Sequence, residues 1–124
     1  MKRLAVMGAG GHGHVVADTA LAAGWGAGAL FDDQWPHAEP AGPWPVEGAL
    51  THLLTRLAEF DGAIAAIGNC ASRWAVHERL RAAGAHMACI VHPGAYVSPH
   101  ARVGAGTVLM AGTVLQFGAR VGDA

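Results

Sequence analysis

Charged residues and cysteines are both scarce in this chain, and each shortage excludes a class of protein. Lys and Arg number 8 and Asp and Glu 9 among 124 residues, which gives a net charge of −1. A protein without a basic stripe cannot neutralise a nucleic-acid backbone, so nucleic acid is not expected as a partner. Cys70 and Cys89 belong to no metal-binding or redox motif. Two isolated cysteines are typical of reduced, buried thiols in the cytoplasm.

A long apolar run is missing as well. The longest uncharged stretch, residues 103–119, is rich in glycine and follows a six-residue pattern, which disfavours a membrane span. At the N-terminus, Lys2 and Arg3 precede an apolar run that Gly8 interrupts, and this run is too short for the core of a signal peptide. We therefore expect a cytoplasmic protein without a transmembrane segment.

What the chain does contain is a six-residue repeat over its last quarter. An aliphatic side chain recurs at every sixth position, at Val91, Val97, Val103, Leu109, Leu115 and Val121. This period suits neither an α-helix nor an ordinary strand, and it is typical of a solenoid of short strands. The alternative is a flexible tail rich in Gly and Ala. The unbroken register of the repeats argues against such a tail. We predict hexapeptide-repeat coils over residues 91–124.

The first 90 residues alternate between apolar runs and helical patterns. The apolar runs suit strands buried on both faces and cover residues 4–7, 27–31, 63–67 and 87–91. The helical patterns cover residues 14–23, residues 47–60, and a segment that Ser72 could cap and that ends at Gly84. Four prolines make residues 34–45 a rigid loop, whose Trp35 and Trp44 either pack on the domain edge or form a lid. We predict a small α/β, Rossmann-like parallel sheet of about four strands and three helices over residues 1–90, followed by the coils over residues 91–124.

A glycine-rich turn follows the first expected strand. Gly8, Gly10 and Gly13 satisfy the G-x-G-x-x-G fingerprint, and Gly11 and His12 complete the turn. Glycines let the backbone approach a phosphate closely, and the start of the next helix offers unpaired N–H groups. The turn therefore predicts a nucleotide diphosphate site. The alternative is a tight strand-to-helix turn with no ligand.

Polar residues follow the next two strands on the same edge of the sheet. Asp32 and Asp33 come 32 − 13 = 19 and 33 − 13 = 20 residues after Gly13, where a carboxylate can accept from ribose hydroxyls. Gly68 and Asn69 follow the third strand and could line the same pocket, although Asn69 could equally cap a helix. Arg73 could reach a phosphate, but a solvated helix face is the simpler interpretation.

The histidines give no clear metal or catalytic site. His12 and His14 flank a glycine, but no nearby Cys or carboxylate completes a metal-ligand set, so we expect no metal. His92 suits a turn before Pro93. His100 would need an orienting carboxylate to act as a base, and the nearest one in the repeats is Asp123.

Five motifs in order along the chain carry a resemblance to a known family. They are residues 8–13, Asp32-Asp33, Pro-Val-Glu-Gly at 45–48, Ile-Gly-Asn at 67–69 with Arg73, and Ile-Val-His-Pro at 90–93 leading into the repeats. This combination resembles the NeuD/PglD-type sugar O/N-acyltransferases, which include sialic acid O-acetyltransferases and acetyltransferases of UDP-4-amino-sugars. The resemblance implies a domain that binds a UDP-sugar through Gly10–Gly13, Asp32 and Asp33, Gly68 and Asn69. It also implies a left-handed parallel β-helix that binds acetyl-CoA, usually in a homotrimer.

The catalytic part of that family is not visible in these residues. The resemblance implies a general-base histidine further along the β-helix, which by the repeat count falls beyond Ala124, so we expect no catalytic residue here. We expect the residues present to bind a UDP-sugar without turning it over, as a monomer or weak dimer. Two alternatives remain: a small NAD- or FAD-binding protein, and a non-catalytic nucleotide-sugar-binding module.

Overall fold

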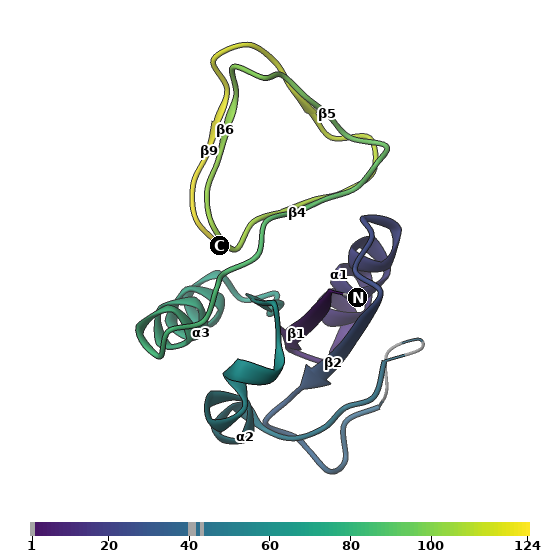
Figure 1. The fold of residues 1–124 in the computed structure, drawn as a ribbon, viewed down its shortest axis with the longest axis vertical. Helices are drawn as coiled ribbons and strands as arrows, with labels where there is room; N and C mark the ends of the chain where they lie inside the picture. The colour runs from purple at the N-terminus through teal and green to yellow at the C-terminus, as the bar shows by residue number, and fades with distance from the viewer. Residues whose placement is uncertain (1, 40–41, 43) are drawn as a thin grey trace.

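A three-stranded parallel sheet forms the centre of the first part of the molecule. The computed structural model describes residues 2–39, 42 and 44–124. The strands are β1 (Arg3–Met7), β2 (Ala27–Phe31) and β3 (Gly62–Ala65), in the order β2-β1-β3 (Figure 1). Leu4 and Ala5 of the central strand β1 are fully buried, like the rest of its apolar run, because helices cover both faces of the sheet.

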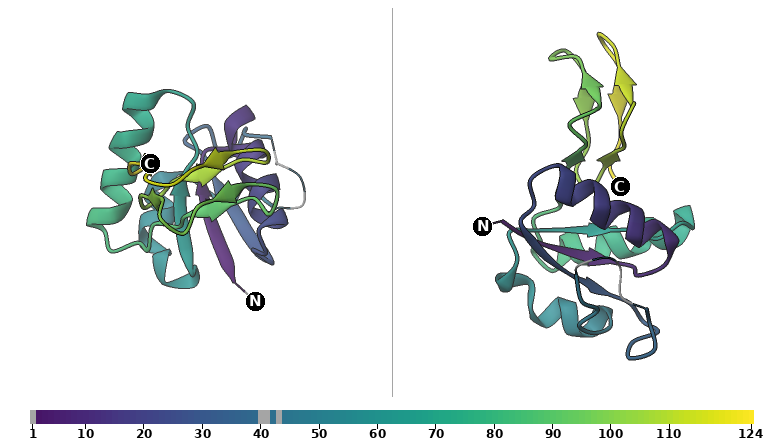
Figure 2. Two further views of the ribbon diagram at one scale, coloured as in Figure 1. Left: turned by 90° about the horizontal axis from the view of Figure 1, so that it is seen from above. Right: turned by 90° about the vertical axis from the view of Figure 1, so that its right-hand side faces the viewer.

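Three α-helices surround the sheet: α1 (Gly11–Ala22), α2 (Leu50–Thr55) and α3 (Cys70–Ala82). Val16 and Ala20 of α1 pack with Leu4 and Val6 on one face. Leu53 of α2 and Leu80 of α3 share a cluster with Ala5 and Met7 on the opposite face. Alternation along β1 thus divides the core into two layers (Figure 2).

The second helix and the fourth strand differ most from expectation. The helix expected over residues 47–60 is α2, followed by the 3₁₀ turn η1 (Leu57–Glu59). The fourth strand, expected over residues 87–91, gives the sheet only an isolated bridge between Met87 and Ala63. Its last two residues, Ile90–Val91, form β4 of the coil instead, because they pair with residues of the six-residue repeat.

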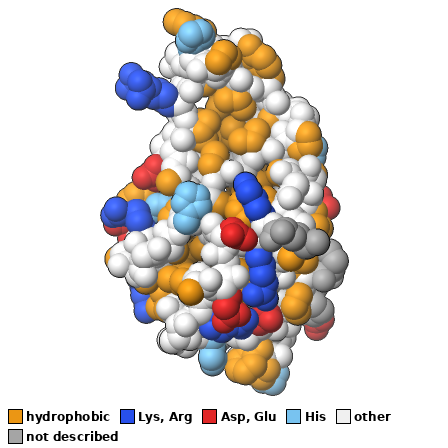
Figure 3. Space-filling view, in the orientation of Figure 1, with side chains coloured by type: hydrophobic (Ala, Val, Ile, Leu, Met, Phe, Trp, Pro, Cys, Tyr) orange, Lys and Arg blue, Asp and Glu red, His pale blue; other side chains and the backbone are white. Residues whose placement is uncertain are grey.

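Residues 90–124 form a triangular coil of short strands. Its sides are β4 (Ile90–Val91) beside β7 (Val108–Leu109), β5 (Tyr96–Val97) beside β8 (Val114–Leu115), and β6 (Arg102–Val103) beside β9 (Arg120–Val121), all parallel. Paired residues are 108 − 90 = 18 positions apart, so three six-residue repeats make one turn (Figure 1). Apolar side chains gather within the triangle (Figure 3).

The loop before α2 packs against the sheet edge. Trp44 is buried and covers Gly28, where an added Cβ would meet the indole ring. Trp35 is 41% exposed and contacts the ring of His52. Pro40 and Pro43 of the expected rigid loop lie outside the described residues.

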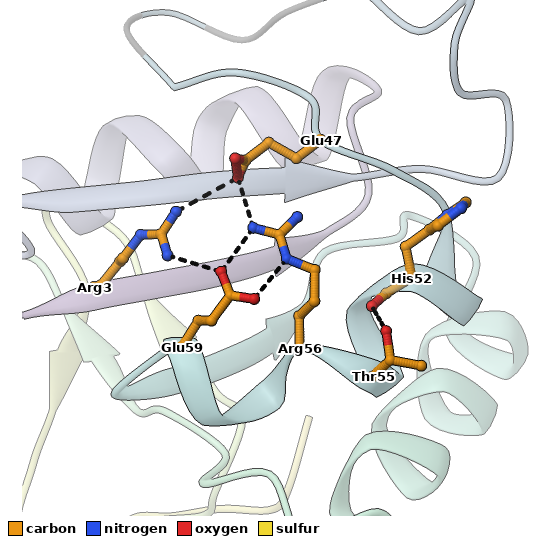
Figure 4. Close-up of polar contacts among 6 residues, drawn as sticks. All are labelled: Arg3, Glu47, His52, Thr55, Arg56 and Glu59. Atoms are coloured by element: carbon orange, nitrogen blue, oxygen red, sulfur yellow. Dashed lines mark hydrogen bonds and ion pairs between the residues drawn. The ribbon is translucent and has the colours of Figure 1, made fainter.

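A group of four charged side chains ties this loop to the start of β1 (Figure 4). Glu59 accepts a hydrogen bond from Arg56 at 2.8 Å and lies 3.4 Å from Arg3. Glu47 lies 3.6 Å from each of these arginines, beyond hydrogen-bond length. All four side chains are partly exposed, so these ion pairs contribute little stability. None of the four lines the hollow beside the glycine-rich turn.

The cysteines differ from expectation, because Cys70 and Cys89 are both exposed. Cys70 opens α3 and Cys89 lies where the chain leaves the sheet, so neither contributes to the core. None of the helices in the described part of the chain has the length and apolar character that crossing a membrane requires.

Candidate functional site

A hollow of about 330 Å³ lies at the carboxyl ends of the strands. Its walls come from the turn between β1 and α1, the end of β2, and the segment between β3 and α3. The lining residues are Gly8, Gly10, Gly11, His12, Asp32, Ala66, Ile67 and Gly68. Open parallel sheets bind ligands at this edge, and the sequence placed six of these eight residues there.

The glycines of the turn have two different roles. Gly8 has a φ of +132°, and an added Cβ would collide with the carbonyl of Ala66. A Cβ on Gly13 would collide with the carbonyl of Gly8. Gly10 and Gly11 have nothing within 4 Å of an added Cβ, and both line the hollow. The fold therefore requires Gly8 and Gly13, whereas Gly10 and Gly11 leave room for a ligand.

Asp32 and Asp33 are adjacent but have different surroundings. The carboxylate of Asp32 accepts the N–H of Ala9 at 2.8 Å and that of Gln34 at 2.9 Å, and it borders the hollow. Each of its oxygens keeps a lone pair for a ligand hydroxyl. Asp33 lies outside the lining, and its carboxylate accepts the N–H of Leu50, the first residue of α2, at 3.0 Å.

The residues after β3 hold the start of α3. Asn69 is the N-cap of α3, because its side-chain oxygen accepts the N–H of Ser72 at 2.9 Å. The sequence offered both Asn69 and Ser72 as helix caps; the structure has Asn69 as the cap, and Ser72 lies inside the helix. Arg73 is part-buried, and its Nη1 donates to the carbonyl of Ile67 at 3.0 Å. Neither Asn69 nor Arg73 lines the hollow.

His12 joins this hollow to a second one of about 340 Å³ between the sheet and the coil. Arg73 and Met110 are among the residues that line the second hollow. Burial lowers the pKa of His12 below its usual value, and the positive charge of Arg73 lowers it further. His12 is therefore neutral at neutral pH, a state in which one ring nitrogen donates and the other accepts.

The other histidines form no further site. His92 accepts the N–H of Gly94 at 2.8 Å, and the ring of His100 packs on Phe117. Within the described residues, no group of three or more His, Cys, Asp or Glu side chains is placed to bind a metal.

The sequence did not indicate the second hollow, because it depends on how the coil packs on the sheet. Ala66 and Ile67 were also missed as lining residues, because the sequence placed them inside the strand expected over residues 63–67, whereas β3 ends at Ala65.

Comparisons with known proteins show similarity in sequence and in fold. A family model described as the PglD N-terminal domain matches residues 3–80. The acetyltransferase domain of PglB from Neisseria gonorrhoeae FA1090, in complex with acetyl coenzyme A, is 39% identical with a TM-score of 0.89, over 98% of this chain and 59% of that one. PerB from Caulobacter crescentus, in complex with CoA and GDP-perosamine, is 29% identical with a TM-score of 0.88, over 99% of this chain and 58% of that one. The chain thus spans about six-tenths of these structures. No protein with a curated description matches it.

Proposed function

The chain belongs to the PglD N-terminal domain family, and we propose on that basis that it forms the nucleotide-sugar-binding part of a sugar acetyltransferase. The observation that carries the proposal is the open side of the glycine-rich turn. Gly10 and Gly11 leave free space beside His12 and Asp32 at the carboxyl edge of the sheet. A diphosphate fits beside glycines at the start of α1, with the ribose toward Asp32.

We propose a UDP-sugar as the ligand, since the motifs resemble enzymes of UDP-4-amino-sugars. PerB, whose aligned part is 29% identical to this chain, was solved with GDP-perosamine, so a GDP-sugar is the natural competitor to test. Gly8, Gly10, Gly11, His12 and Asp32, which all line the hollow, would contact the nucleotide directly. Asn69 and Asp33 would act by holding the helices that border the site.

We propose that residues 91–124 are the first coils of a left-handed parallel β-helix, distinct from the sheet domain of residues 1–90. Acetyl-CoA would supply the acetyl group, and Arg102 and Arg120, which lie opposite each other on β6 and β9, suit its phosphates. In the described residues His92 and His100 have no carboxylate partner, which a general base needs. We therefore assign no catalytic residue and expect binding without acetyl transfer by these 124 residues. The whole enzyme would be a homotrimer, and these residues alone a monomer or weak dimer.

Titration calorimetry with UDP, UDP-N-acetylglucosamine, GDP-mannose and NAD tests the proposal. We expect heat from the two uridine ligands and none from NAD. Folded protein that gives no heat with any nucleotide sugar would refute the proposal, and selective binding of NAD would favour a dinucleotide-binding protein. Binding of GDP-mannose in preference to the uridine ligands would replace UDP with GDP.

Replacing Gly11 with leucine tests whether the glycine-rich turn is the binding site. The added side chain meets no protein atom within 4 Å of its Cβ but projects from the lining of the hollow. We therefore expect G11L to keep its melting temperature and lose UDP binding. The control is H14L, since His14 is exposed on the same helix and lies outside the lining. Retained UDP binding in folded G11L would mean that the turn is not the site.

A further inference from the structure

The hydrogen-bonding groups of Arg73 are mostly taken up by the protein itself. Its Nη1 donates to the carbonyls of Ile67 at 3.0 Å and Gly68 at 3.4 Å. Its Nη2 lies 3.5 Å from the sulfur of Cys70, and its Nε faces the carbonyl of Ala124 at 3.4 Å. A guanidinium has five N–H groups, so at most one remains for a ligand. Arg73 thus lacks the free pair of N–H groups that a two-pronged contact with a phosphate requires.

The atoms that Arg73 holds belong to the wall of the hollow. Ile67 and Gly68 both line it, and they lie between β3 and α3, outside any regular element. The backbone of Arg73 is fixed in turn, because its N–H donates to the carbonyl of Asn69 at 2.9 Å. The side chain therefore connects the first turn of α3 to the segment that precedes it.

Arg73 also acts on His12, with which it shares the second hollow. Its charge, together with burial, keeps the pKa of His12 low. Other titratable groups face this region from different elements. Asp32 lies across the first hollow, His77 lies behind Gly106, and Asp123 accepts the N–H of Ala105 at 3.0 Å.

We propose that Arg73 is a positioning residue of the nucleotide-sugar site, which holds Ile67 and Gly68 in place and faces His12 rather than binding the phosphates. The inference rests on the proposed function. It changes the role given to Arg73 by the sequence, where this residue was a candidate phosphate ligand. The wall that Arg73 supports borders the whole ligand, so its loss weakens binding of the nucleoside and of the diphosphate alike.

The test compares uridine with UDP on R73K, R73Q and the control R79Q. Arg79 is exposed on the same helix, so R79Q removes one charge without touching the hollow. NMR titration measures both affinities, weak ones included, and the pH titration of the His12 ring in the ligand-free protein. We expect R73K and R73Q to weaken uridine and UDP by a similar factor, roughly tenfold. The titration midpoint of His12 rises in R73Q, remains low in R73K because lysine keeps the charge, and does not change in R79Q.

Two results would overturn the inference. Weakened UDP binding with unchanged uridine binding in R73Q would make Arg73 a direct phosphate ligand. Unchanged affinity for both ligands in R73K would show that the fork-shaped contact with Ile67 and Gly68 is not needed. Circular dichroism establishes whether each variant is folded. If R73Q does not fold, the conservative variant R73K still allows the affinities for uridine and UDP to be compared with those of the unchanged protein. Failure of the unchanged protein to bind uridine, UDP or GDP-mannose would instead refute the proposed function.

Discussion

His12 occupies the position of greatest consequence among the individual residues. It is the side chain that borders both hollows and follows the two glycines left open to a ligand. It shares the first hollow with Asp32 and the second with Arg73. Burial lowers the pKa of His12 and the charge of Arg73 lowers it further, so that the imidazole is neutral in the folded protein at neutral pH.

The lowered pKa of His12 makes folding stability depend on pH in a defined direction. The unfolded chain takes up a proton near the ordinary pKa of 6.5, while the folded protein takes it up only at lower pH. Stability contributed by neutral His12 is therefore present above 6.5 and is lost as pH falls toward the folded pKa. We expect H12N to show a smaller drop in melting temperature than the unchanged protein between roughly pH 7.5 and about pH 5.5.

H14N is the matched control for this measurement, because His14 is exposed on the same helix. Its drop in melting temperature over the same range should equal that of the unchanged protein. An equally large drop in H12N would show that His12 does not couple to folding.

For individual residues, the sequence predicted where they lie better than what they contact. The glycine-rich turn, Asp32 and Gly68 could be placed at one site because parallel strands deliver their carboxyl ends to the same edge. The partners of Asp33 could not be predicted, since they depend on where α2 begins. The hydrogen bonds of Arg73 depend likewise on the path of the chain between β3 and α3.

Among the elements, α3 shows how a helix boundary shapes the site. The helix begins at Cys70, and its N-cap Asn69 has an extended backbone with φ −69° and ψ 123°. The Asn69 side chain satisfies one of the N–H groups left without partners in the first turn. The same boundary fixes the direction of Ile67 and Gly68, which line the hollow.

Replacing the cap Asn69 should therefore lower the free energy of unfolding more than replacing Ser72. N69A loses the hydrogen bond to the N–H of Ser72 and should lower the free energy of unfolding by about 1 kcal/mol. S72A removes an exposed hydroxyl within the helix and should change it by less than about 0.5 kcal/mol. Urea denaturation of both variants without ligand measures the difference. The reverse order would mean that the cap is Ser72, the other candidate that the sequence offered.

The types of the elements could be predicted more accurately than the residues at which they begin and end. Apolar runs identified β1 to β3, and helical spacing identified α1 to α3. The start of α1 at Gly11 instead of His14 escaped the pattern, because a glycine and a histidine carry no apolar periodicity. Ile90–Val91 was ambiguous for a different reason, since an apolar run suits either a sheet or the first side of the coil.

At the scale of the whole molecule, the sheet and the coil pack against each other directly. Ile90 and Ala88 share one buried cluster with Val16 and Ala20 of α1, and Met110 of the coil packs against it. The hydroxyl of Thr19 on α1 reaches the sulfur of Met110 at 3.3 Å. The six-residue period predicted a coil but not the contact between the coil and α1. Periodicity describes the side chains inside the coil and not those on its outer face.

His77 is the least expected part of this contact. It is fully buried on α3, stacks on Trp74 with ring centroids 5.3 Å apart, and has no hydrogen-bond partner among the described residues. Gly106 of the coil lies against it, since an added Cβ would come 2.6 Å from Nδ1. A buried ring without hydrogen bonds is held there by packing alone, which makes the fit between α3 and the coil sensitive to small additions.

Comparing two glycines distinguishes the energetic cost of a collision with His77 from the cost of backbone strain. Gly106 and Gly112 have nearly the same conformation, with φ of +76° and +80°, but nothing lies within 4 Å of a Cβ added to Gly112. We expect G112A to lower the free energy of unfolding by about 1–2 kcal/mol, the cost of placing a side chain at positive φ. G106A should cost about 1–3 kcal/mol more, because His77 must also move. Urea denaturation gives both values, and an H77A background should bring the two glycine variants close together, since the colliding ring is then gone. Equal losses in G106A and G112A with His77 present would mean that the coil does not press on α3, and that the two parts of the molecule are joined mainly through α1 and β4.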